Sequence, residues 1–126
     1  MTDYVKIKIQ RFRRKFQRRY GDGHYFFACH AAFPIAFTVD MLYQLWANFK
    51  NVPQQAVDKA ESLLPIQSRT IDRLAVSDLL QSGLCRRTDT DLFEMETPVR
   101  AYLLQELETC FSGERLDELA RFSFQY

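Results

Sequence analysis

Apolar residues recur at intervals of three and four along most of this chain, and that spacing restricts it to a predominantly helical fold. In the first twenty residues the pattern runs through Val5, Ile9, Phe12 and Phe16, and Lys and Arg occupy most of the other positions. The 126 residues are 47% hydrophobic and 26% charged. These proportions suit one compact domain with a substantial core.

The same spacing predicts the other helices. We expect helices at about residues 4–20, 25–33, 39–49, 69–81, 97–111 and 116–124, with a further short helix containing Ala56, Val57, Ala60, Leu63 and Leu64. Helix 39–49 is apolar on more than one side, so we expect it at the centre of the core. Thr38 and Thr97 are the expected N-caps, and Gly83 is the expected C-terminal cap of helix 69–81.

One segment departs from the helical period. Residues 84–95 predict two short strands joined by a polar turn, which is typical of a β-hairpin. An isolated hairpin is unstable, so Leu84, Phe93 and Met95 should anchor it on the preceding helix. A plain helical bundle with a structured loop at 84–95 is the alternative.

A helix–turn–helix core followed by a hairpin is the winged-helix arrangement. We therefore expect a mainly α fold, with a winged-helix-like domain in residues 21–126 and a basic amphipathic helix in residues 1–20. Together they should form a single compact domain.

The run LAVSDLLQSGLCRRTDTDLFEMETPVRAYLLQEL, residues 74–107, resembles the winged-helix segment that follows the nucleotide-binding core of STAND-type signalling ATPases. In that family a Met-His-Asp element precedes a helix that opens with Val-Arg. Here Met95-Glu96-Thr97 stands in its place and Val99-Arg100 follows. The family's nucleotide-sensing histidine is replaced by Glu96, and the chain has no GxxxxGK[ST] loop. The resemblance therefore implies shape and a signalling context without nucleotide chemistry.

A second run, HAAFPIAFTVDMLYQLWANF, resembles segments of large multidomain bacterial signalling proteins. It supports the same context.

The formal net charge of +1 hides an uneven distribution. Residues 1–20 hold eight Lys and Arg against one acid, a net charge of +7, whereas residues 21–126 hold nine bases against fifteen acids, a net charge of −6. The basic helix could pack on the acidic body, or it could contact nucleic acid or a membrane surface. If the helix packs on the body, its Lys and Arg side chains form a face exposed to solvent.

A DNA-binding transcriptional regulator is the alternative function that the basic helix suggests. The candidate contacts to nucleic acid or another acidic partner are Arg11, Arg13, Arg14, Arg18, Arg73, Arg86 and Arg87. Asp89 and Asp91 in the turn of the hairpin oppose this reading, because they would face phosphates with like charge.

Catalytic and cofactor signals are weak. Cys29 and His30 are sequence neighbours whose side chains diverge on a helix, so they do not form a nucleophile–base pair. Asp89-x-Asp91 lacks the glycine and glutamate of a calcium loop. We expect no enzymatic activity, no cofactor and no metal.

Two further features of the sequence bear on the cellular compartment. Three cysteines without CxxC spacing suit reduced thiols in a cytoplasmic protein. No apolar run approaches the length of a transmembrane helix.

The leading hypothesis is a non-enzymatic protein–protein interaction or regulatory module of a bacterial signalling system. It would bind a protein partner or a second copy of itself through apolar residues at the edges of the fold. The candidate interface residues are Tyr43, Phe49, Phe122, Phe124 and Tyr126.

Overall fold

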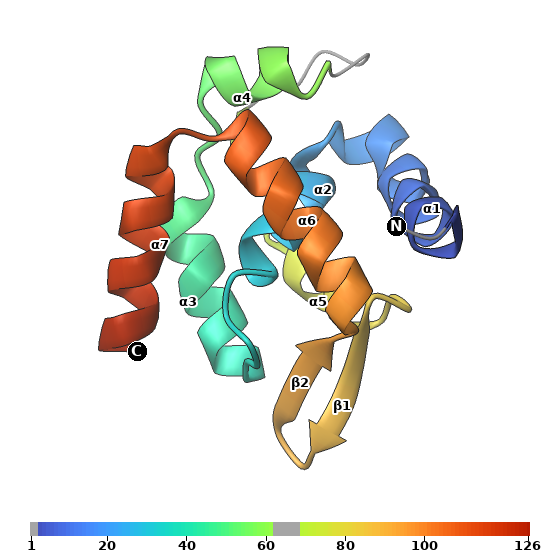
Figure 1. The fold of residues 1–126 in the computed structure, drawn as a ribbon, viewed down its shortest axis with the longest axis vertical. Coiled ribbons are helices and arrows are strands. Elements are labelled where there is room, and N and C mark those ends of the chain that lie inside the picture. The colour runs from blue at the N-terminus through green and yellow to red at the C-terminus, as the bar shows by residue number, and fades with distance from the viewer. Residues whose placement is uncertain (1–2, 62–68) are drawn as a thin grey trace.

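A mainly helical domain with one antiparallel hairpin is seen in a computed structural model, which describes residues 3–61 and 69–126 (Figure 1). The helices are α1 (Asp3–Tyr20), α2 (Gly23–Ala31), α3 (Val39–Phe49), α4 (Gln54–Lys59), α5 (Leu74–Leu80), α6 (Thr97–Cys110) and α7 (Gly113–Gln125). The strands are β1 (Cys85–Asp89) and β2 (Leu92–Met95). The predicted mainly α fold with a short two-stranded hairpin is confirmed.

Helix α2 lies at the centre of the core. All nine of its residues are buried, and α1, α3, α5 and α6 contact it. It has no Lys, Arg, Asp or Glu, so every side of it can meet another helix. The prediction that α3 occupies the centre was wrong, because Tyr43 and Trp46 on α3 reach the surface.

Two local sequence signals determine where α2 and α3 begin. Gly21, between α1 and α2, has a φ of 63°, a conformation that glycine adopts without steric cost. At the start of α3, the Thr38 hydroxyl accepts a hydrogen bond of 3.1 Å from the Met41 amide, as an N-cap should.

Helix α5 is shorter than predicted. Residues 69–71 are extended instead, because Ile71 donates its amide to the Lys50 carbonyl and Val52 donates to the Arg69 carbonyl, each at 2.7 Å. The predicted glycine cap was also wrong. Gln81 is the C-cap, and the Ser82 hydroxyl donates to the Leu79 carbonyl at 2.7 Å.

Two other boundaries differ from expectation. Glu96 takes the N-cap position of α6, one residue before the predicted Thr97, and its backbone angles are not helical, with φ −54° and ψ 137°. Such one-residue shifts are usual at helix ends. The short helix predicted within 54–68 is α4, and Leu63 and Leu64 lie outside the described residues.

The hairpin is held at its base by buried side chains. Leu84, Phe93 and Met95 are 3%, 9% and 5% exposed, so the three predicted anchors are buried. Phe37 adds an antiparallel bridge to Phe93, with N–H···O distances of 2.9 and 2.8 Å. An extended segment between α2 and α3 therefore lies beside β2.

The last two helices close the domain. Figure 1 shows α6 crossing in front of α2 and α7 running beside α3. Phe122 of α7 packs edge-to-face on Phe49 of α3, with ring centroids 5.7 Å apart. None of the helices in the described residues is both long and apolar enough to cross a membrane.

Candidate functional site

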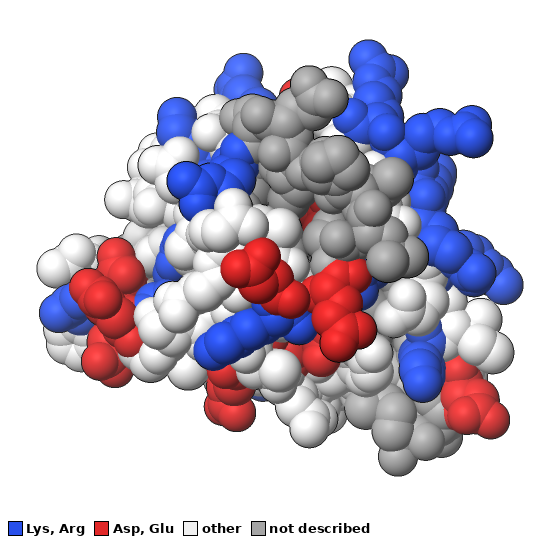
Figure 2. Space-filling view, turned by 90° about the horizontal axis from the view of Figure 1, so that it is seen from above, with Lys and Arg blue, Asp and Glu red and all other residues white. Residues whose placement is uncertain are grey.

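Helix α1 divides its two faces between the core and solvent. Val5, Ile9 and Phe12 are buried against the rest of the domain. The outer face carries Lys6, Arg11, Arg14, Lys15, Arg18 and Arg19, all exposed. None of these six forms an ion pair with any residue that the structure describes. Figure 2 shows the Lys and Arg side chains gathered along the side of the molecule where α1 lies.

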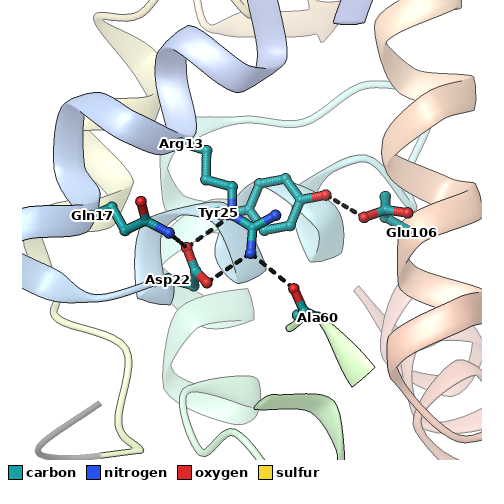
Figure 3. Close-up of polar contacts among 6 residues, drawn as sticks. All are labelled: Arg13, Gln17, Asp22, Tyr25, Ala60 and Glu106. Carbon is teal, nitrogen blue, oxygen red and sulfur yellow. Dashed lines mark hydrogen bonds and ion pairs between the residues drawn. The ribbon is translucent and has the colours of Figure 1, made fainter. Parts of the chain in front are cut away.

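Arg13 is the exception on this helix, because its guanidinium turns inward (Figure 3). Its Nε and Nη2 donate to the two Asp22 carboxylate oxygens at 2.9 and 2.8 Å, and Nη2 also donates to the Ala60 carbonyl at 3.2 Å. Gln17 donates to the same carboxylate at 3.0 Å. The hydrogen bond to Asp22 raises the pKa of Arg13. Arg13 therefore joins α1 to the start of α2 and the end of α4.

The Arg13 guanidinium also covers an aromatic ring. Its central carbon lies 4.3 Å from the centre of Tyr25, whose hydroxyl donates to Glu106 at 2.6 Å (Figure 3). Burial, above all, raises the pKa of Tyr25 far beyond its usual range. This cluster links α1, α2 and α6 inside the fold, so Arg13 was wrongly grouped with the surface arginines.

A groove lies between α1 and the turn that joins α5 to β1, and we name it the α1 groove. It has a volume of about 280 Å³. One wall carries Lys8, Arg11 and Lys15, the opposite wall is Gln81–Leu84, and Phe12 and Phe16 also line it.

Two large apolar side chains also stand on the exposed surface of α1. Tyr4 is 59% exposed and Ile7 is 51% exposed. The Lys8 ammonium lies 5.7 Å from the Tyr4 ring centre and 3.8 Å from a Glu96 carboxylate oxygen. The exposed surface of α1 therefore combines cations with apolar groups.

The other predicted arginines lie on different elements. Arg86 and Arg87 are exposed on β1, which Figure 1 shows at the opposite end of the domain from α4. Arg86 pairs with Glu94 at 2.8 Å, and Arg87 lies over the Phe93 ring. Arg73, just before α5, lies 4.9 Å from the Tyr43 ring centre. The α1 groove contains none of these three.

Both histidines are buried and engaged in internal contacts. His24 stacks between Phe16 and Tyr20 and donates from Nε2 to Asp78 at 2.8 Å. Desolvation lowers the pKa of His24 and outweighs the opposing effect of Asp78.

His30 donates from Nδ1 to the Phe26 carbonyl at 2.7 Å, and its Nε2 accepts from Arg115 at 3.2 Å. Burial lowers the pKa of His30 to about 3. The ring is therefore neutral at physiological pH.

The three thiols are free, and their surroundings suppress their reactivity. Cys29 and Cys110 are buried and Cys85 is half-buried. Desolvation raises the pKa of all three, to about 12 for Cys85. A thiol held in its protonated form is a poor nucleophile. The described residues contain no group of three or more His, Cys, Asp or Glu that could hold a metal ion.

The predicted aromatic interface is only partly exposed. Phe49 is 6% exposed beneath α7, so it is a core residue rather than a surface contact. Tyr43 and Phe122 are half-buried. Phe124 is 93% exposed, and Tyr126 is 50% exposed with its hydroxyl donating to Asp40.

Sequence reasoning missed the α1 groove and the exposed pair Tyr4 and Ile7. The spacing of Lys8, Arg11 and Lys15 could have indicated the cationic wall, since residues three and four apart share a helix face. Nothing in the local sequence indicates that Gln81–Leu84 lies opposite.

The comparisons with known proteins give no relative from which a role could be inferred. No family model matches the chain, and neither a curated protein nor a solved structure is significantly similar to it.

Proposed function

We propose that this chain is a non-enzymatic protein-interaction module of a bacterial signalling system, and that its partner docks on the exposed surface of α1. The observation that carries the proposal is the row of exposed cations on α1 that lack acidic partners among the described residues, combined with exposed Tyr4 and Ile7. Interfaces of proteins join apolar contact with charge complementarity. The signalling context rests on the resemblance of residues 74–107 to the STAND-type winged helix.

The order of elements supports a winged-helix-like fold for the body. It runs α2, an isolated bridge residue at Phe37, α3, the short α4, α5 and then the β1–β2 hairpin as the wing, with Phe37 beside β2. In DNA-binding members of such folds, the helix before the wing and the wing itself meet the duplex.

DNA binding has less support, because those two elements carry acids here. Asp72 before α5 and Asp89 and Asp91 at the end of the hairpin are exposed carboxylates that would face phosphates. Arg86 is already paired with Glu94. The exposed Tyr4 and Ile7 gain nothing from a phosphate backbone, whereas a protein surface can bury them.

The non-enzymatic assignment is supported by how the reactive side chains are used. Both histidine rings make internal hydrogen bonds, and burial raises the pKa of each thiol. A general base or a nucleophile needs access to substrate and a suitable pKa.

The test is affinity capture from a lysate of its native cells, with and without nuclease, followed by light scattering on the purified chain. The proposal expects a specific protein to remain bound after nuclease treatment, or a defined dimer of the chain. Retention of nucleic acid alone, or a strict monomer that captures no protein, would contradict it.

A further inference from the structure

We infer that the α1 groove binds an acidic segment of a partner protein, with carboxylates on Lys8, Arg11 and Lys15 and an apolar side chain against the half-buried Phe16. This inference rests on the proposed function and names the chemistry of the partner. It differs from a general attraction between charges, because it places the contact at one groove with a defined lining.

The cationic wall has a regular geometry. Lys8, Arg11 and Lys15 are separated by three and four residues, so they form one row on α1. At a rise of 1.5 Å per residue, the row is about 10 Å long. In an extended segment, side chains on one face recur about every 6.6 Å. Two alternate acidic residues therefore match the row, and Arg18 continues it by a further turn.

The opposite wall is uncharged. It consists of Gln81, Ser82, Gly83 and Leu84, none of which is acidic. Lys8 already pairs with Glu96 at 3.8 Å, so a partner carboxylate shares Lys8 with Glu96. A Cβ added to Gly83 would lie 3.5 Å from Cε of Lys8, which is an ordinary contact distance across the groove. The missing side chain at Gly83 therefore keeps the groove open. The backbone at Gly83 is not left-handed, so a side chain can be introduced there without strain.

The lining of the groove favours a peptide over other polyanions. A volume of about 280 Å³ admits a few side chains of a peptide. The half-buried Phe16 supplies apolar contact, which a phosphate backbone does not use. A membrane surface is also less suited, because Val5, Ile9 and Phe12 are buried in the domain.

Binding would be measured by fluorescence anisotropy, using a labelled peptide of about twelve residues that alternates Glu with Leu. The full chain should bind it, and binding should weaken at high salt. Arg11→Glu with Lys15→Glu should reduce the affinity at least about tenfold, since charge is reversed at the contact. Lys59→Glu with Arg121→Glu makes the same change in net charge at exposed positions away from the groove, and it should leave the affinity within about threefold.

A second pair of variants tests the groove without altering a cation. Gly83→Glu places a carboxylate opposite Lys8 and should also weaken peptide binding at least about tenfold. Gly113→Glu is the matched control, because a Cβ there meets nothing within 4 Å and the change in charge is identical. Thermal unfolding of each variant shows that it is folded.

The inference is overturned if the peptide does not bind, or if each control weakens binding as much as its groove variant. Tighter binding of a duplex DNA than of the peptide, lost in the groove variants, would overturn the inference in favour of nucleic acid. Tighter binding of anionic vesicles, lost in the same variants, would overturn it in favour of a membrane surface. If wild type and Gly83→Glu capture the same native protein equally, the proposed function holds but the α1 groove is not the binding site. A strictly monomeric chain that captures no protein contradicts the proposed function, and the peptide titration then decides the groove alone.

Discussion

Arg13 donates two hydrogen bonds to the fully buried carboxylate of Asp22, and this ion pair fixes a basic helix to the core of the domain. The Asp22 side chain is 0% exposed and that of Arg13 is 14% exposed. Arg13 therefore has a structural role, whereas the exposed cations of the same helix can contact a partner.

Replacing Asp22 with Asn should destabilise the domain by about 3–5 kcal/mol, because it leaves the Arg13 charge buried without its counter-charge. Urea unfolding followed by circular dichroism measures the free energy of unfolding. Arg14→Gln is the control, since Arg14 is exposed and should cost less than about 0.5 kcal/mol. Equal effects of the two substitutions would mean that the inward pair does not stabilise the fold.

Stability should fall with pH below about 7 because of the buried His30. The folded pKa is lowered to about 3, below the unfolded value near 6.5, so the unfolded chain binds the proton first. His30 therefore contributes its full stability above the unfolded pKa and loses it as pH falls towards the folded pKa. Between pH 7 and pH 5 the loss from His30 alone is about 2 kcal/mol.

Urea midpoints at several pH values check this dependence. The variant His30→Gln should be less stable at pH 7 but should lose less stability on acidification than the wild type. The shift of His24 acts in the same direction, so some pH dependence should persist in the variant. An identical pH slope in the two proteins would show that His30 is not held neutral.

The native thiols should react slowly with a disulfide reagent at pH 8. Burial raises their pKa values, so little thiolate forms in the folded state. Cys85 is half-buried and should react first, whereas Cys29 and Cys110 should require unfolding. The count of reactive thiols with and without urea measures this. Fast labelling of Cys29 in the native protein would contradict the burial of α2.

The two phenylalanines near the end of α7 should behave differently. Phe122→Ala removes a half-buried ring that packs on Phe49, and it should cost about 1–2 kcal/mol. Phe124→Ala removes a ring that is 93% exposed and should change stability by less than about 0.5 kcal/mol. Thermal unfolding compares them. A large loss for Phe124→Ala would assign that ring an internal contact.

Local sequence signals predicted much of the fold. The spacing of Val5, Ile9 and Phe12 identified the buried face of α1, and Thr38 identified the start of α3. These features depend on residues within a few positions of one another. The same holds for the hairpin, whose anchors Phe93 and Met95 follow from alternation.

The candidate site could not be predicted in the same way. In the sequence, the eight Lys and Arg of residues 1–20 look equivalent. Only the change of chain direction at Gly21, seen in the structure, places Asp22 beside Arg13. The α1 groove needs Gln81–Leu84, which are about seventy residues from Lys8 and Arg11 along the chain. Contacts at such separations depend on the packing of α5 and the hairpin, which no local pattern records.

Amide chemical-shift mapping tests the central claim most directly, because it reports which surface an acidic partner meets. The alternating Glu–Leu peptide would be titrated into the labelled full chain. We expect the largest shifts at Lys8, Arg11, Lys15 and Ser82–Leu84, with little change at the end of the hairpin. Shifts concentrated at Thr88–Asp91 and Leu74, with α1 unaffected, would contradict a docking site on α1.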